Sequence, residues 1–481
     1  MAEEIQTDSA SGFTPGPATD GQNAPQLPAR FDHVDWLGFF ATTLIALAGY
    51  LFTLAPNVTL GFSGITSTGA FYAGVPHPPG YPVWTLYSWC FTKLVPFSNV
   101  ACRVAVGSAV ASAVACGLIA LIVTRGGMVL FHNERLFANF SPSKLAQLRV
   151  VCGVVAALVL AFSGAVWRYA VIAETRAISL LLFTAVLCLF FRWSLAPTQR
   201  RYLACAFFAL GILLTDSQEL IVALPALIVA VMLTNVRLGR DLCFLPLPLA
   251  VFATSANQYN IVCKAFLTEA NWPLLGTALV VLLAGISLTV ITRRIGTEWK
   301  AALGCSLAIL LGLAFYLYVP MTSMTTPPVN WGYPRTTEGF LHVISRGQYE
   351  LVSPTDDLER FAGQVWELTK MTGEQFGWLY LVIAIIPFCF IGRMTSQGRR
   401  LLGGIVAFWV CVTLLMLIEI NPPPDRQAGD MVVQYFAASH AILAVWLGWG
   451  LMIIGSKFAE PSQADKNSTV GTPVRENVPD Q

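Results

Sequence analysis

The sequence is poor in charge, and this shortage limits the class of protein. Only 12% of its 481 residues are Asp, Glu, Lys or Arg, whereas a soluble domain carries roughly a quarter. The 29 basic and 27 acidic residues leave a net charge of +2, so the basic field that a nucleic-acid partner needs is missing. Because 55% of the residues are hydrophobic and the mean hydropathy is +0.63, we expect an integral membrane protein surrounded by membrane lipids.

Other absences exclude further classes. The eleven cysteines form no CxxC pair and no cluster with histidine, so neither a disulfide framework nor a metal site is expected. The N-terminal segment has no basic and apolar stretch typical of a cleavable signal peptide. We predict disordered cytoplasmic tails at 1–33 and 458–481 around a transmembrane domain at 34–457. The cysteine usage and the missing signal favour a bacterial cytoplasmic (inner) membrane over an endoplasmic reticulum.

Long apolar runs separated by short polar breaks predict an all-α bundle. We count about twelve transmembrane helices, within a range of roughly ten to thirteen. The predicted spans are 36–55, 101–124, 149–168, 177–194, 202–215, 219–234, 242–257, 273–292, 300–319, 377–392, 401–420 and 436–456. Lys and Arg gather in alternate loops, which places those loops in the cytoplasm. Both termini are then cytoplasmic, and 56–100 and 320–376 form two large loops on the opposite face.

The two predicted outer loops hold residues suited to ligand binding. The first contains the motif GVPHPPGYP at 74–82, whose prolines fix the backbone around His77, and Tyr81 opens an amphipathic segment typical of an interfacial helix. The second loop combines aromatic rings with amide and guanidinium groups, which suit sugars and phosphates. A transporter, which keeps its polar groups at mid-membrane on broken helices, is disfavoured by this distribution.

These motifs resemble those of multi-pass glycosyltransferases of the C-type membrane fold (GT-C), in particular bacterial relatives of protein O-mannosyltransferases. The further motifs are FSGAVW at 162–167 before Ala173-Glu174, PVNWG at 328–332 with RGQY at 346–349, and NPPPD at 421–425 before Ser439-His440. The resemblance implies a GT-C-like bundle and a polyprenyl-phosphate donor carrying a mannose-like hexose. It also implies an acceptor, such as a protein, on the non-cytoplasmic face, with no cofactor and no divalent metal.

The chain departs from the family's pattern at the acids. The family shows an acidic Asp-Ser-Gly-Glu element where this chain has Phe62-Ser-Gly-Ile65, and no Asp or Glu lies between Asp35 and Glu134. Further on, Arg176 replaces an aromatic residue, and TDSQE at 215–219 replaces an Asn-His pair followed by Gln. The catalytic acidic element is therefore degenerate. Two classes stay open: an active transferase, or an inactive homologue that acts as a scaffold or accessory subunit of a membrane complex.

Each candidate residue has a functional and a structural interpretation. His77 either donates to a phosphate or sugar, or packs as a structural histidine between prolines. Glu174 either supplies the missing carboxylate or pairs with a nearby arginine, and Asp216 and Glu219 are either catalytic or cap a turn. The catalytic candidates are Glu174, Asp216 and Glu219. The substrate-binding candidates are His77, Tyr81, Asn330, Trp331, Arg346, Gln348, Tyr349 and Arg426.

Overall fold

A computed structural model describes residues 30–131, 137, 140–244, 272–348, 352–423 and 432–458. These residues are almost entirely helical and contain no β-strand beyond one isolated bridge. Among them, eight helices are long and apolar enough to cross a bilayer, or nine if one bent pair counts as a span. The predicted all-α membrane protein is thereby confirmed.

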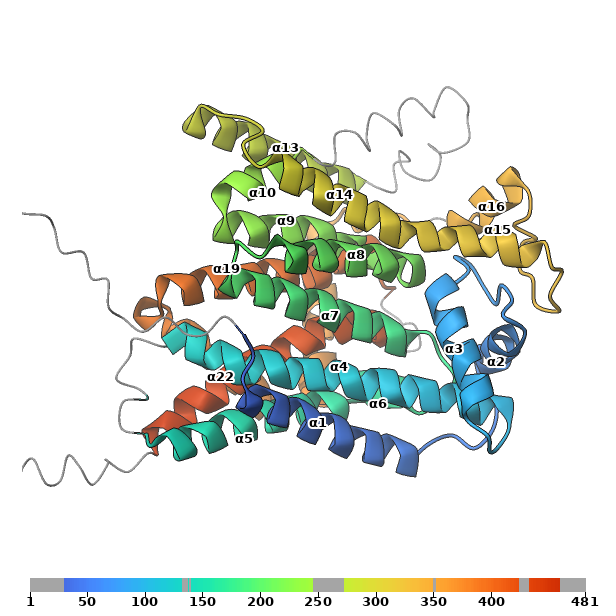
Figure 1. Ribbon diagram of the computed structural model, residues 1–481, viewed down its shortest axis with the longest axis horizontal. Helices are drawn as coiled ribbons and strands as arrows, with labels where there is room; N and C mark the ends of the chain where they lie inside the picture. The colour runs from blue at the N-terminus through green and yellow to red at the C-terminus, as the bar shows by residue number, and fades with distance from the viewer. Residues whose placement is uncertain are drawn as a thin grey trace, which may run out of the picture.

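The long helices form a bundle in which they run side by side (Figure 1). Three of them continue through 3-10 or π-helical turns, so that each reads as one span. They are α1 (His33–Phe52), α4 (Val100–Phe131), α5 (Pro142–Ala161), α7 (Arg176–Leu195), α13 (Trp272–Thr292), α14 (Trp299–Leu313) with η4 (Ala314–Leu317) and α15 (Tyr318–Ser323), α19 (Ser396–Val410) with η6 (Cys411–Leu415) and α20 (Met416–Ile420), and η7 (Val433–Phe436) with α22 (Ala437–Lys457).

Three predicted spans correspond to shorter helices. The first is α8 (Arg200–Asp216), whose 17 residues reach about 25 Å, slightly less than the ~30 Å of a bilayer core. The second is the continuous helix of η2 (Gln218–Val222) and α9 (Ala223–Thr234), and the third is α18 (Trp378–Cys389), which is bent by 106° from α17 (Leu358–Phe376). Most of the predicted span 242–257 lies outside the described residues, so the count of about twelve stays a prediction.

Small residues allow the helices of the bundle to approach closely. The central helix α4 is rich in Ala, Gly and Ser, is buried over most of its length, and packs against α1, α5, α7 and α22. At the α8–α14 crossing, a side chain at Gly211 or Gly312 would collide with the backbone of the other helix. Close packing through small residues is the usual way in which helices associate in lipid.

The shorter elements mark the two ends of the bundle. At one end lie α2 (Ser63–Tyr72), α3 (Pro82–Leu94), α15 and α16 (Thr337–Ile344), while the start of α1 and the end of α22 lie toward the other end (Figure 1). The remaining short elements are α6 (Gly164–Ala170), α10 (Val236–Leu242) and η5 (Ile391–Arg393). The two segments predicted as outer loops therefore meet at one end of the bundle.

Candidate functional site

The two outer segments pair through their backbones. The amide of Val75 donates to the Val329 carbonyl at 2.9 Å, and the amide of Trp331 donates to the Val75 carbonyl at 3.0 Å. Glycine is required at Gly74, because a Cβ atom there would collide with the Val329 carbonyl oxygen. The GVPHPPGYP motif is thus the surface on which the second segment lies, and it brings the candidates of both segments together.

His77 lies at the centre of an aromatic cluster formed by this pairing. Its ring centroid is 4.7 Å from that of Phe62, 5.7 Å from that of Trp331 and 6.2 Å from that of Tyr81. Its Nδ1 lies 2.8 Å from the Pro78 carbonyl; because a carbonyl only accepts, we assign the ring proton to Nδ1 and acceptor character to Nε2.

The charge state of His77 follows from its surroundings. Burial lowers the pKa of His77, the hydrogen bond to the Pro78 carbonyl partly opposes this, and the charge of Arg346 lowers the pKa further, against a smaller effect of Glu174. The ring is therefore neutral near pH 7. A neutral ring with its proton on Nδ1 accepts hydrogen bonds at Nε2, so this state does not suit the predicted donation to a phosphate.

An arginine pair shares one carboxylate beside this cluster. Arg176, the first residue of α7, forms an ion pair with Glu219, and Arg346 Nη2 lies 3.7 Å from the other oxygen of Glu219. The Arg176 guanidinium also lies 4.3 Å from the centroid of the Tyr435 ring. The two guanidiniums and one carboxylate carry one positive charge in excess, which is available to an anionic ligand.

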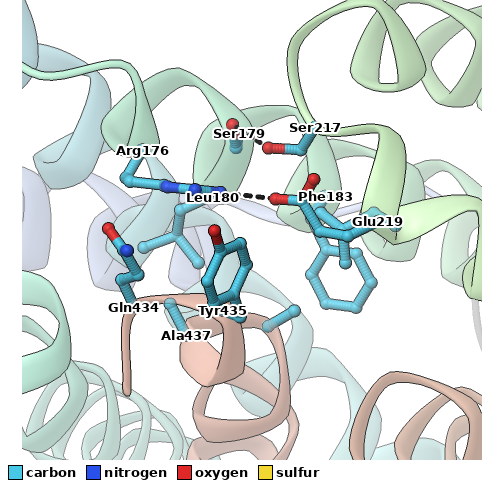
Figure 2. Close-up of a pocket in the computed structure, with 11 residues that line it drawn as sticks. Arg176, Ser179, Leu180, Phe183, Ser217, Glu219, Gln434, Tyr435 and Ala437 are labelled. Carbon is cyan, nitrogen blue, oxygen red and sulfur yellow. Dashed lines mark hydrogen bonds and ion pairs between the residues drawn. The ribbon is translucent and has the colours of Figure 1, made fainter. Parts of the chain in front are cut away.

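A small pocket opens against Arg176 and Glu219. Figure 2 shows the Arg176 side chain reaching the Glu219 carboxylate above the Tyr435 ring. On the same wall, the Ser217 hydroxyl donates to the Ser179 hydroxyl at 2.7 Å. Apolar side chains complete the lining, namely Leu180, Phe183 and Leu220. The mixture of charged groups, hydroxyls and an aromatic face is typical of polar small-molecule sites.

Glu174 is held by contacts at the start of α7. Its Oε1 accepts hydrogen bonds from the Thr175 amide at 3.0 Å and the Thr175 hydroxyl at 3.2 Å. Its carbonyl accepts from the Trp84 indole at 3.1 Å, which ties it to α3. In the described part of the chain no arginine lies within ion-pair distance of its carboxylate. The half-buried carboxylate therefore lacks the arginine partner considered as its structural interpretation.

Asp216 and Glu219 occupy different environments although they are three residues apart. Asp216 ends α8, is 1% exposed, and its carboxylate oxygens have no hydrogen-bond partner among the described residues. It lies close to the backbone of Trp84 in the first turn of α3. Glu219 holds the two arginines and is 15% exposed. The burial of Asp216 and the ion pairs of Glu219 with two arginines both suit structural roles. A catalytic role of either residue stays a prediction.

The remaining predicted site residues divide into three groups. Tyr81 packs on His77, and burial raises the pKa of its phenol, which stays protonated. Asn330 donates to the Ser323 carbonyl at 3.2 Å, while Gln348 is exposed to solvent. Tyr349 and Arg426 lie outside the described residues. No group of three potential metal ligands occurs within the described part of the chain.

Sequence reasoning did not find the partnership of Arg176, Glu219 and Tyr435. These residues come from α7, η2 and η7, which are far apart in the chain. The available signal was the simultaneous gain of Arg176 and Glu219 relative to the family's pattern. Two such opposite charges, gained within a membrane protein, are expected to pair.

Comparison with known proteins supports the resemblance inferred from the motifs. Residues 65–239 match the family model of the protein O-mannosyl-transferase TMEM260 N-terminal domain. The chain is also 27% identical over 241 residues to protein O-mannosyl-transferase TMEM260 of Mus musculus, a match that covers 49% of this chain and 31% of the mouse protein. No solved structure matches the chain. The similarity to O-mannosyltransferase-like membrane glycosyltransferases is thereby confirmed, and it spans less than a third of that relative.

Proposed function

We propose that this protein is a membrane glycosyltransferase that moves a mannose-like hexose from a polyprenyl-phosphate donor to an acceptor, such as a protein. The observation that carries the proposal is the convergence of His77, Trp331 and Arg346 from two separate segments, next to Arg176 and Glu219. The similarity to protein O-mannosyl-transferases supports the same reaction class.

The proposal includes a membrane arrangement. We assign the paired segments to the non-cytoplasmic face and both termini to the cytoplasm of a bacterial inner membrane, in a GT-C-like bundle. The support is that the cation-rich loops predicted to be cytoplasmic alternate with these segments. In Figure 1 the paired segments lie at one end of the bundle, whereas the start of α1 and the end of α22 lie toward the other end.

Donor binding follows from the chemistry of the exposed groups. Trp331 is 39% exposed and offers a ring face to a hexose, as aromatic side chains do in sugar sites. Arg346 and Arg176 offer guanidinium donors to the lipid phosphate. Because Glu219 neutralises only one of the two guanidiniums, the other is available to the single negative charge of a phosphodiester.

The transfer step needs a group that accepts the acceptor's proton. Glu219 is held by two arginines and Asp216 is buried, so Glu174 is the carboxylate that we assign as general base. As the acceptor oxygen bonds to the anomeric carbon, its proton passes to Glu174 and the bond from that carbon to the phosphate oxygen breaks. Arg346 and Arg176 stabilise the charge that develops on the departing lipid phosphate.

The proposal is tested by a transfer assay with the full-length chain in nanodiscs. The probe is radiolabelled polyprenyl-phosphate mannose, with bacterial membrane proteins as acceptors. We expect transfer by the wild type and a loss of about tenfold to a hundredfold in Arg346→Ala, the usual weight of a charge-assisted contact. Arg335→Ala is the matched control, since Arg335 is an exposed arginine of the same segment. Absence of transfer by the wild type with any polyprenyl-phosphate hexose would contradict the proposal.

A second candidate function is that of an inactive homologue serving as a scaffold or accessory subunit. It is favoured by Phe62, whose ring lies against His77 at the position of the family's first acid. This alternative stands if the wild type shows no transfer and the double variant Phe62→Asp, Ile65→Glu does not gain any. A stable partner should then co-purify with the chain in mild detergent.

A further inference from the structure

Helix α17 is sharply bent relative to α18, the apolar helix that follows it. It has 19 residues and begins at a capping aspartate, Asp357, whose carboxylate accepts from the amides of Glu359 and Arg360. It ends at Gly377, where the chain turns by 106° into the apolar helix α18. Since α18 is apolar and packs against the spanning helix α22, we take it to point into the bilayer, so that α17 runs roughly along the bilayer plane.

The surface of α17 is divided into three sectors. One sector packs onto the bundle and includes Gln364, Leu368 and Phe376, each less than 10% exposed. A second sector is charged and contains Glu359, Arg360, Glu367, Lys370 and Glu374. The third sector is apolar but exposed: Leu358 is 80% exposed and Trp366 is 60% exposed, with Ala362 between them at the four-residue spacing of one helix face.

Both ends of α17 are fastened to the bundle, so its height is fixed. Near its start, the Gln364 amide donates to Asn421 Oδ1 at 2.9 Å, and the Thr355 hydroxyl donates to Gln364 Oε1, also at 2.9 Å. At its end, the Phe376 ring stacks on His440 of α22 with centroids 5.2 Å apart. Asn421 ends α20 and His440 lies in the first turn of α22, so α17 is attached near the ends of two long helices.

The five charged residues determine how deep α17 lies. Each charge at the centre of a bilayer costs about 2.5–3.5 kcal/mol, so the helix does not cross the hydrocarbon core. Its exposed apolar sector, however, continues into Trp378 and Leu379 of α18, which are 53% and 68% exposed. Because α18 has apolar side chains around its circumference, its exposed face meets lipid, and the adjoining sector of α17 lies at the same lipid.

We propose that α17 is a membrane-surface helix whose partner is the lipid bilayer. Its sector of Leu358, Ala362 and Trp366 lies about 5–10 Å into the boundary between head groups and acyl chains. The charged sector faces water. The charged sector holds two cations and three anions, so it has no excess of positive charge to attract anionic lipid. The contact of α17 with lipid is therefore made by the apolar sector and does not need anionic lipid.

The test uses a nitroxide attached to a ketone amino acid, introduced singly at position 366 or 367 of the full-length chain in nanodiscs. This chemistry avoids the native cysteines, and both positions are exposed, so the label does not disturb the packed face. Collision with oxygen reports lipid, and collision with a nickel chelate reports water. Position 385 in α18, 60% exposed, is the lipid-facing control.

We expect position 366 to resemble position 385, with oxygen favoured over nickel, while position 367 favours nickel. Changing the nanodiscs from neutral lipid to half anionic lipid should leave the depth at 366 unchanged. Equal nickel access at 366 and 367 would overturn the proposal, since the sector would then face water or a protein partner. A depth that depends on anionic lipid would overturn the apolar character of the contact.

Discussion

Replacement of Gly74 by alanine should separate the two outer segments while leaving the bundle intact. The new methyl group would collide with the Val329 carbonyl oxygen and would also touch the ring of Pro327 at 3.4 Å. Neither group can rotate away, because one is backbone and the other is a proline ring. The segment around Val329 must therefore move by on the order of 1 Å to restore ordinary contact distances.

This displacement has a calculable cost. It breaks or weakens two backbone hydrogen bonds, Val75 to Val329 and Trp331 to Val75, each with a net value of about 0.5–1.5 kcal/mol. The free energy of local opening should fall by about 1–3 kcal/mol, which accelerates exchange of the two amides by about 5- to 150-fold. The transfer rate should also fall, because Trp331 moves away from His77.

Hydrogen–deuterium exchange of the full-length chain in nanodiscs measures this effect at residues 73–76 and 328–332. The matched control is Gly64→Ala, because a methyl group at Gly64 meets its nearest atom, on Val58, at an ordinary 3.6 Å. Exchange in the bundle helices should be unchanged in both variants. If Gly74→Ala leaves the amides of Val75 and Trp331 as protected as in the wild type, the close approach inferred at Gly74 is wrong.

Three further predictions concern the base, the pH dependence and the packing. Glu174→Gln should lower the transfer rate about 100- to 10,000-fold without unfolding, because the amide oxygen still accepts from Thr175; an unchanged rate would exclude Glu174 as the base. Since the pKa of His77 is held below its usual value, the ring gains a proton only as the pH falls below about 6.5. Transfer should decline there, because the protonated ring no longer accepts a hydrogen bond at Nε2. His77→Gln should flatten that part of the pH profile, and a decline that persists in the variant would belong to another group. Gly312→Ala should destabilise the α8–α14 crossing by about 1–3 kcal/mol and lower the melting temperature in detergent. Gly304→Ala in the same helix, where a methyl group meets nothing within 4 Å, should not, and equal melting temperatures would contradict the packing at this crossing.

The all-α bundle could be predicted because apolar runs and cation-rich breaks are local features of the sequence. The glycine and prolines at 74–82 leave room for a neighbouring backbone, so the sequence marks this motif as a place where another segment can approach. The partnership of Arg176 with Glu219 depends on the packing of α7 against the turn after α8, which no local pattern encodes. The sequence predicts a loop at 320–376, yet this segment contains α16 and α17. The charged sector of α17 breaks its apolar run, so that only the four-residue spacing of its buried face marks the helix.

The affinity of the full-length chain for polyprenyl-phosphate mannose tests most directly whether the two outer segments and the arginine pair form one donor site. Equilibrium binding in nanodiscs should show saturable binding by the wild type. It should weaken about tenfold to a hundredfold in Arg346→Ala and change by less than about twofold in Glu174→Gln, since a general base acts on the transition state. Absence of saturable binding, or equal affinities in the wild type and Arg346→Ala, would contradict the assignment of this site.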